Sequence, residues 1–583
     1  MVNSDFSFFG KQIVIYSDGK VPAYSDDLTH TILFKEILHR FVQQLKQKES
    51  SLLQIFPREV DEEQLLFLFQ QLATYQKKFV IQKHPELEPY FKDTYKLNQF
   101  VESLYNFWRS YERFFVCYSD EMLMHRYHER PYTTFNDTVE NLNHLVRKLY
   151  RETCENITDT HPNIYRQLPA GIQVGFIVVK DPIKLPHPYN KLENVNYIKQ
   201  VLIEPPLIID PPTNTRTGEF KKIQKNPIDY IPHLEEQEWI CYPAQVGELL
   251  IHVFFNNKFI GLGTALSNLF DLATNGQLKN KPDAIYLFGI PKEIAGQIDS
   301  CPTVFFEDEK NDLIIASVPD GDEFAYFGYL KKMMLTLHNA IMMKRGRLPV
   351  HGAMVKIDLI NDKTANIIIM GDTGAGKSES LEAFRKIGND YIREMTIIFD
   401  DMGSLSIENE ELKAFGTEMG AFIRLDDLSP GYALGNIDRS IIMSPQKKNA
   451  RVVLPITTMK EVLKGQKIDY FLYANNYEAV DETHQVLEIF NTPKEAIEVF
   501  KRGRSMSKGT TSSTGITETY FVNIFGPTQY KEIHETLAEK YFQALFDNKV
   551  IVGQIRTMLG IIGKENLGPE TAAKALLEMI NKN

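Results

Sequence analysis

The sequence predicts an α/β protein in three parts, and three observations indicate this. Residues 1–161 contain long runs whose apolar residues recur at helical spacing. Residues 162–345 contain short apolar runs separated by turns rich in Pro and Asn, as is typical of a mixed α/β domain. Residues 346–583 contain a glycine-rich turn between a strand-like run and a helix-like run. We therefore expect a helical N-terminal region, a mixed α/β domain and a C-terminal α/β domain.

Length and composition favour a soluble globular protein with more than one core. The chain has 583 residues, of which 43% are hydrophobic and 24% charged, and single cores rarely grow beyond about 250–300 residues. A formal net charge of −11, with both signs interspersed, argues against nucleic acid or a membrane surface as a partner. We find neither a signal peptide nor an apolar run long enough to span a membrane, and we expect a cytoplasmic protein. The four cysteines lie far apart and are expected to be reduced thiols.

The first part is expected to form amphipathic helices over residues 28–49, 62–79 and 97–115. The third run is rich in aromatic residues, and such a stripe is more typical of a core than of a ligand site. We assign no chemistry to residues 1–161, which we expect to be a helical elaboration or a surface that binds a protein partner.

The second part is expected to contain several strands and one long helix. The helix should follow Tyr326 and reach Met343. The strands are expected over residues 173–179, 200–209, 249–255, 283–288 and 312–318.

The glycine-rich turn matches a phosphate-binding loop. It fits the spacing G-x-x-x-x-G-K-[ST], with a strand-like run (366–370) before it and a helix-like run (379–386) after it. Glycines let backbone N–H groups surround phosphate oxygens, and the helix directs the positive end of its dipole at them. We expect Lys377 to reach the β- and γ-phosphates of a nucleoside triphosphate and Ser378 to bind its divalent cation. The expected nucleotide-binding residues of the loop are Gly371, Asp372, Thr373, Gly374, Ala375, Gly376, Lys377 and Ser378.

An acidic pair follows the next apolar run. We expect residues 395–399 to form a strand that ends at Asp400 and Asp401. A carboxylate at the end of a strand beside a phosphate loop holds the nucleotide-bound cation, directly or through water.

The order of these residues resembles that of the ATP-type phosphoenolpyruvate carboxykinases. In that family a Tyr-x-x-x-x-Lys-Lys segment precedes a His, then the phosphate loop, then an Asp-Asp pair. Residues 418–424 (EMGAFIR) resemble its Glu-Gly-Gly-x-x-x-Lys segment, residues 449–455 (NARVVLP) its Asn-Thr-Arg-Val-x-Tyr-Pro segment, and residues 512–519 (SSTGITET) its adenine-side segment. The resemblance covers roughly residues 320–530. The matching residues before and after the loop are Tyr326, Lys331, Lys332, His351, Asp400 and Asp401.

The resemblance implies an enzyme that uses ATP, Mg²⁺ and Mn²⁺ to convert oxaloacetate into phosphoenolpyruvate and CO₂, the lyase step of gluconeogenesis. It implies catalytic roles for Tyr326, Lys331, Lys332, Lys377 and Arg451. Lys377 and Arg451 would neutralise the transferred phosphoryl group, and Tyr326 and Lys331 would face the substrate. The site is expected in a cleft between the last two domains.

The resemblance also implies the ligand-binding positions. Mn²⁺ would bind Lys332, His351 and Asp401, which requires Lys332 to be a neutral amine with a depressed pKa. Ser378 and the nucleotide phosphates would hold Mg²⁺. Arg424 would lie near the phosphates, and Ile516 and Thr517 near the adenine.

The sequence departs from the family at three points. The family's Thr-Gly-Arg-Ser-Pro-Lys segment, whose arginine grips the substrate carboxylate, is missing, and Arg216 is the nearest candidate for that role. Thr514 stands where the adenine-side arginine is expected, which leaves the base preference open. The loop itself, GDTGAGKSE, is closer to that of the HPr kinases, which phosphorylate a protein serine.

Three hypotheses follow from these features. The first is a carboxykinase-like enzyme acting on oxaloacetate, and the second is an HPr kinase-like enzyme of the same fold that phosphorylates another small molecule or a protein serine. The third is a nucleotide-sensing protein without catalysis, against which Lys332, His351 and Arg451 argue.

Overall fold

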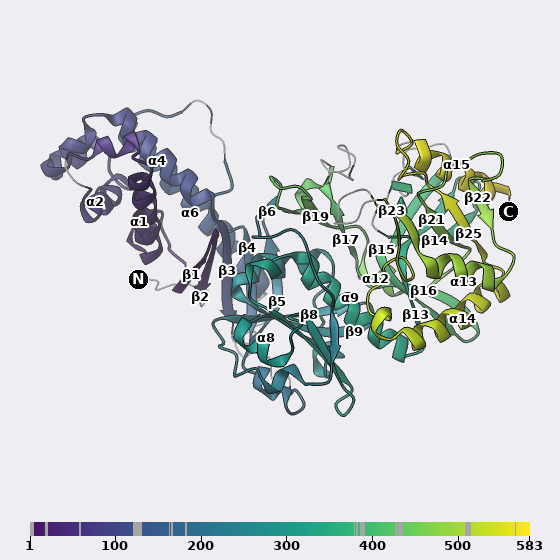
Figure 1. Cartoon of the computed structure of the whole chain (residues 1–583). Coiled ribbons are helices and arrows are strands. Elements are labelled where there is room, and N and C mark those ends of the chain that lie inside the picture. The colour runs from purple at the N-terminus through teal and green to yellow at the C-terminus, as the bar shows by residue number, and fades with distance from the viewer. Residues whose placement is uncertain are drawn as a thin grey trace. The chain divides into compact units, whose positions relative to one another are not determined.

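The structure is a computed structural model of the chain (Figure 1). It describes residues 5–17, 21–57, 60–119, 131–162, 164, 167–180, 184–372, 374–377, 379–380, 383–384, 391–425, 428, 435–507, 515–565 and 567–582. With 39% helix, 29% strand and several mixed sheets, the protein is a mixed α/β protein, as predicted. The chain forms two compact units: residues 1–182 with 195–207, and residues 183–194 with 208–583. The boundaries predicted near residues 161 and 345 stay a prediction.

The first unit combines helices with a mixed sheet. Its strands follow the order β1-β2-β3-β4-β5, in which β2, β3 and β4 are parallel and the outer pairs are antiparallel. The strands are β1 (Asp5–Phe9), β2 (Gln12–Ser17), β3 (Glu112–Ser119), β4 (Val174–Val179) and β5 (Asn196–Ile203). The helices are α1 (Ile32–Gln47), α2 (Glu62–Leu72), α3 (Lys77–Lys83), α4 (Thr94–Arg109) and α6 (Pro131–Thr158). Their apolar faces form one core, in which Phe41 and Phe100 pack edge to face.

The first part is therefore not purely helical, and two predicted helices are wrong: the run expected over residues 62–79 breaks after α2 and restarts as α3, and the third run is too long. The aromatic helix α4 ends at Arg109, and residues 112–119 form β3 between β2 and β4. Phe114, Phe115 and Val116 are fully buried there. Helical spacing continues through this stretch, but pairing with two parallel neighbours decides its conformation.

The second unit begins with a mixed sheet in the order β8-β9-β10-β12-β11-β7. Its strands are β7 (Lys221–Ile223), β8 (Trp239–Val246), β9 (Leu249–Asn256), β10 (Ala284–Ile290), β11 (Val304–Asp308) and β12 (Leu313–Pro319), and its helices are α7 (Ile260–Ala265), α8 (Lys292–Ile298) and α9 (Phe327–Lys344). β4, β9, β10, β12 and α9 confirm the predicted elements, whereas residues 200–209 contain two strands, β5 and β6 (Leu207–Ile209).

A second sheet of this unit carries the predicted phosphate loop, in the order β20-β16-β15-β13-β14-β21-β25-β22. β14, β21 and β25 run parallel, and their other neighbours are antiparallel. The strands are β13 (Leu348–Leu359), β14 (Thr364–Met370), β15 (Ile392–Glu408), β16 (Glu411–Gly416), β20 (Gln466–Lys467), β21 (Tyr470–Asn475), β22 (Leu487–Ile489) and β25 (Ile551–Arg556).

Helices cover both faces of this second sheet (Figure 1). The helices around it are α12 (Met459–Leu463), α13 (Pro493–Arg502), α14 (Lys531–Asp547) and α15 (Leu567–Lys582). Successive side chains of β21 point to opposite faces. Phe471 packs on Phe542 of α14 with ring centroids 5.7 Å apart, and Leu472 joins the core around Leu576 of α15.

Two smaller β elements complete the unit. β17 (Gly420–Arg424), β19 (Arg451–Pro455) and β18 (Ile441–Met443) form an antiparallel sheet, and β23 (Arg504–Ser507) and β24 (Gly515–Glu518) form a hairpin. None of the helices in the described ranges combines the length and apolar character that a membrane span requires. The four cysteines form no disulfide bond among the described residues.

Candidate functional site

The glycine-rich turn joins β14 to a helical turn, as predicted. Lys377, Glu379 and Ser380 are helical, whereas Thr373 and Ser378 lie outside the described residues. Gly374 and Gly376 have φ angles of 79° and 101°, which favour glycine. A Cβ on Gly376 would lie 2.7 Å from Oγ1 of Thr557, so this position admits no larger residue without a shift.

In the structure without ligand, the lysine of the loop contacts the loop itself. Nζ of Lys377 donates to the carbonyl of Gly371 at 2.6 Å and to that of Asp372 at 3.3 Å. A phosphate oxygen would offer this ammonium a charged acceptor in place of neutral carbonyls.

One cavity of about 100 Å³ is lined by most of the predicted site residues, and all of its lining residues belong to the second unit. Tyr326 and the two lysines come from α9 and its N-terminus, and the rest come from β13, β15, β17, β19 and the phosphate loop. The cavity is lined by Tyr326, Lys331, Lys332, His351, Asp372, Gly374, Lys377, Glu379, Asp400, Asp401, Phe422, Ile423, Arg424, Arg451 and Phe525.

The acidic pair is placed differently from the prediction. β15 continues to Glu408, so Asp400 and Asp401 lie within the strand and not at its end. The pairing of β15 with β13 shifts by one residue between Ile397 and Phe399, just before the acidic pair. Asp401 itself has a φ of 134°, which is rare outside glycine. The irregular backbone bends Asp401 into the cavity, and such strain is typical of functional sites.

Lys331 is the centre of a buried charge cluster. Its Nζ lies 2.7 Å from Oδ2 of Asp401 and 3.2 Å from Oε1 of Glu418. Burial lowers the pKa of Lys331, but the two carboxylates outweigh burial and raise it. Burial, opposed by Lys331, raises the pKa of Glu418 to about 8. Burial also acts to raise the pKa of Asp401, but Lys331 and His351 hold it well below its ordinary range.

His351 is held in one tautomer. Its Nδ1–H donates to the carbonyl of Val522, because a carbonyl can only accept. Nε2 therefore faces Oδ1 of Asp401, 3.0 Å away. A neutral Nε2 and a carboxylate oxygen are both acceptors, so this contact needs a cation, either a proton on the ring or a metal ion.

Lys332 lines the same cavity as His351 and Asp401. Burial, followed by the charge of Arg216, lowers the pKa of Lys332 to about 8, although Asp401 opposes the shift. No three His, Cys, Asp or Glu side chains in the described ranges form a metal-type group. With the amine of Lys332 as the third donor, Lys332, His351 and Asp401 could together hold a divalent metal ion, because a pKa of about 8 lets the amine lose its proton and Nε2 of His351 faces Asp401.

The cationic wall of the cavity comes from the small sheet. Arg424 and Arg451 are directly opposed on β17 and β19. The guanidinium of Arg451 lies 5.3 Å from the ring centroid of Phe422. Burial raises the pKa of Tyr326, but the positive charges of Arg451 and Arg216 oppose this shift, which indicates that both arginines are close to its hydroxyl.

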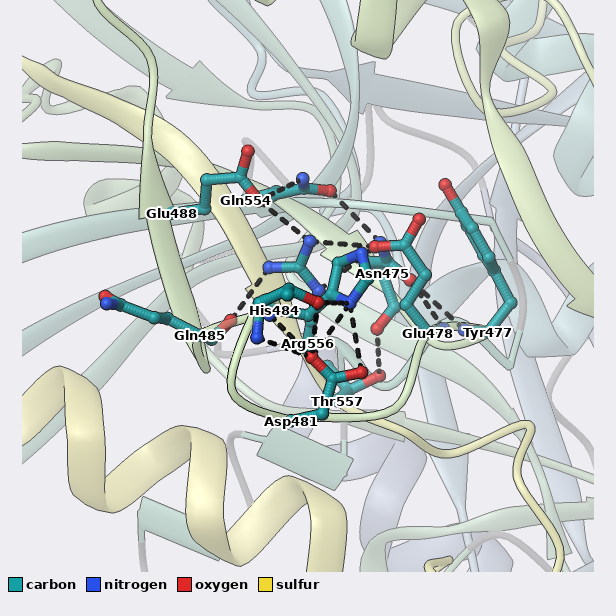
Figure 2. Close-up of polar contacts among 11 residues, drawn as sticks. Asn475, Tyr477, Glu478, Asp481, His484, Gln485, Glu488, Gln554, Arg556 and Thr557 are labelled. Atoms are coloured by element: carbon teal, nitrogen blue, oxygen red, sulfur yellow. Dashed lines mark hydrogen bonds and ion pairs between the residues drawn. The ribbon is translucent and has the colours of Figure 1, made fainter.

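A polar network centred on the buried Arg556 lies at the ends of β21 and β25 (Figure 2). Arg556 is only 2% exposed. It donates to Glu478 at 3.0 Å, to Glu488 at 2.7 Å and to the carbonyl of Gln485 at 2.8 Å. Asn475 donates to the same carboxylate oxygen of Glu478 at 2.8 Å. Arg556 therefore links the segments that follow β21 and precede β25, next to the strand ends on which the glycine-rich loop rests.

Sequence reasoning missed the residues that hold the loop from behind. Asn476 donates to the carbonyl of Gly374 at 3.0 Å, and Thr557 donates to that of Ala375 at 2.8 Å. Asn476 directly follows β21, which pairs with β14, and Thr557 directly follows β25, which pairs with β21. Ligand sites of parallel sheets lie at these strand ends. A polar residue directly after a parallel strand is therefore the sequence feature that could have indicated these two residues. Phe422 and Phe525 also line the cavity; Phe422 lies within the family-like segment 418–424, but sequence reasoning gave neither ring a role.

The structure does not bring the predicted adenine-side residues into the cavity. Ile516 and Thr517 lie on β24, where they pair with Met506 and Ser505, and Ile516 is 44% exposed. Thr514 lies outside the described residues.

A scan of the chain against protein-family models and a search of curated proteins find no match.

Proposed function

We propose that this protein is an ATP-dependent phosphotransferase of the phosphoenolpyruvate carboxykinase type, with that family's phosphate-loop fold in its second unit. One observation carries the proposal: a single cavity holds the loop lysine Lys377 together with Lys332, His351 and Asp401. A phosphate loop alone suits many nucleotide-binding proteins. Joined to a Lys, His and Asp set in one cavity, it suits phosphoryl transfer to an enolate.

The proposed reaction consumes oxaloacetate and ATP. The bond between C3 and the C4 carboxylate breaks and releases CO₂, and its electron pair forms the enolate of pyruvate. The enolate oxygen attacks the γ-phosphorus while the bond to ADP breaks, which yields phosphoenolpyruvate. Lys377 and Arg451 supply fixed positive charge to the phosphoryl oxygens, whose charge spreads in the transition state. When bound, Mn²⁺ would supply Lewis-acid stabilisation of the enolate oxygen.

Arg216 supports a carboxylate substrate. It is close enough to Lys332 and Tyr326 to affect the pKa of both, and burial lowers its own pKa. Nη1 donates to the carbonyl of Gly218 at 2.7 Å, while the buried Nε has no hydrogen-bond partner among the described residues. A planar guanidinium with donors to spare is suited to gripping a carboxylate.

A second candidate function is phosphorylation of a hydroxyl group, as in the HPr kinases. Asp372 and Glu379, the acidic residues that distinguish this loop, both line the cavity. A carboxylate beside the phosphate site can accept the proton of an attacking hydroxyl. In this alternative Asp401 also holds the cation, so loss of activity in Asp401→Asn does not separate the two.

The test is an assay of the purified protein with ATP, Mg²⁺ and Mn²⁺ that follows oxaloacetate loss and phosphoenolpyruvate formation. The proposal expects phosphoenolpyruvate to form, and to disappear with Lys332→Ala and with Asp401→Asn. Nucleotide binding with no effect on oxaloacetate contradicts it and directs the search to hydroxyl acceptors, beginning with protein serines.

A further inference from the structure

Asn476 directly follows β21, and both ends of its buried side-chain amide are engaged. Nδ2 donates to the carbonyl of Gly374 at 3.0 Å and to that of Met506 at 2.9 Å. Oδ1 accepts from the N–H of Met506 at 2.8 Å. An amide has two N–H donors, so Asn476 shares them between the phosphate loop and one residue of β23.

Met506 belongs to the β23–β24 hairpin, where it is paired with Ile516. The hairpin has a second attachment to β21, because the hydroxyl of Tyr473 donates to the carbonyl of Arg504. β21 runs parallel to β14, which leads into the loop. The loop therefore follows β14, the hairpin is attached to the adjacent strand β21, and Asn476 is hydrogen-bonded to both loop and hairpin.

Thr557 holds the loop in a different way. Its Oγ1 donates to the carbonyl of Ala375, and its N–H donates to the carbonyl of Asn475 at 2.8 Å. The C=O of one residue and the N–H of the next point in opposite directions across a planar trans peptide. Anchoring the Ala375 carbonyl therefore turns the N–H of Gly376 away from Thr557, while Gly374 and Lys377 beside it line the cavity.

We propose that Asn476 is a positioning residue that couples the phosphate loop to the β23–β24 hairpin. A polyphosphate that accepts hydrogen bonds from the loop N–H groups shifts or stiffens the Gly374 peptide. Because the Asn476 amide is bonded to the Gly374 carbonyl, the change reaches the backbone N–H and carbonyl of Met506 through Asn476. Conversely, a group bound against the hairpin tightens polyphosphate binding, since coupling between two sites is reciprocal. The inference rests on the proposed function only in taking the loop as a polyphosphate site.

The test uses inorganic tripolyphosphate, which has neither base nor ribose to touch the hairpin directly. Hydrogen exchange of the full-length protein is measured over residues 504–507 and 515–518, and affinity is measured by calorimetry. In the wild type, tripolyphosphate is expected to slow exchange in the hairpin. In Asn476→Ala this protection is expected to vanish while tripolyphosphate still binds, about fivefold or more weakly.

Two matched variants separate coupling from general loosening. Tyr473→Phe removes only a hairpin attachment, so its hairpin should exchange faster without ligand yet remain protected by tripolyphosphate. Thr557→Val removes the bond to the Ala375 carbonyl and a longer contact to the Asn475 carbonyl but no contact with the hairpin, so it should weaken tripolyphosphate binding without changing exchange in the ligand-free hairpin. If Asn476→Ala does not fold, Asn476→Asp replaces it, since it keeps an acceptor for the Met506 N–H and loses both donors.

The outcomes distinguish the two proposals. Binding of tripolyphosphate to the wild type without hairpin protection, or protection that persists in the Asn476 variant, overturns the coupling alone. Failure of the wild type to bind tripolyphosphate overturns the proposed function and the coupling with it.

Discussion

Lys331 and Asp401 form a buried ion pair in which Nζ and Oδ2 are 2.7 Å apart. The side chain of Lys331 is only 1% exposed, and the same Nζ also contacts Glu418. This lysine therefore balances two acids that would otherwise be buried beside each other, which makes it part of the structure of the site as well as of its proposed chemistry.

Replacing Lys331 by Met is expected to lower the free energy of unfolding by about 3–5 kcal/mol, because breaking one partner of a buried pair leaves uncompensated charge. Urea denaturation measures this loss. The control is Lys356→Met, which removes a partly exposed pair with Asp358 and should cost about 1 kcal/mol or less. Equal losses in the two variants would contradict the assignment of Lys331 as a charge centre.

Glu418 should make stability depend on pH. Burial raises its pKa from 4.5 to about 8, so between these values the folded protein holds a proton that the unfolded chain has released. The contribution of Glu418 is complete below pH 4.5 and is lost as the pH rises through about 8, at up to about 1.4 kcal/mol per pH unit. Glu418→Gln cannot ionise, so the unfolding free energy of the wild type should fall relative to this variant over that window. A constant difference between the two proteins would show that Glu418 ionises normally.

Metal binding should depend on the protonation of Lys332. Its pKa is lowered to about 8, and only the neutral amine binds a metal. Mn²⁺ affinity is therefore expected to rise with pH up to about 8 and then level off, as followed by electron paramagnetic resonance of free Mn²⁺. Lys332→Ala should bind about tenfold or more weakly and lose this pH dependence around 8. An unchanged pH profile in the variant would remove Lys332 from the metal site.

Gly376→Ala should impair nucleotide binding without any change of charge. The residue has a φ of 101°, and an added Cβ would lie 2.7 Å from Oγ1 of Thr557, so the loop must move. A cost of about 1–2 kcal/mol corresponds to about tenfold weaker ATP binding, measurable by calorimetry. Gly346→Ala is the matched control, because Gly346 also has a positive φ of 75° but nothing lies within 4 Å of its added Cβ. Similar ATP affinities in both variants would argue against a tightly packed loop.

The sequence predicts the strand, glycine-rich turn and helical turn of residues 364–380 because the conformation there depends on a few adjacent residues. Strand, glycines and lysine stand together in the chain, and the structure keeps them in that order. α4 was predicted too long, because the sheet partners that turn residues 112–119 into β3 come from distant parts of the chain. The strand predicted to end at the acidic pair continues as β15 for the same reason: its residues past Asp401 pair with β13 and β16, which other parts of the chain supply.

The sequence predicts those residues of the candidate site that belong to motifs. It does not predict residues that only tertiary contacts bring to the site. Lys332, His351 and Asp401 were expected together and line one cavity. Ile516 and Thr517 were expected near the nucleotide, but they lie on β24 and do not line that cavity. Asn476 and Thr557 are single polar residues after strands, and only the folded chain shows that they hold the loop carbonyls.

Two arginines of the small sheet place like charges side by side. Arg424 and Arg451 are cross-strand partners, and directly opposed like charges repel. An anion bound between them is expected to reduce that repulsion and so to stabilise the folded protein, whether or not it is turned over. Because phosphate stabilises proteins generally by exclusion from their surface, the melting temperature of the wild type should rise more with added phosphate than that of Arg451→Ala at equal ionic strength.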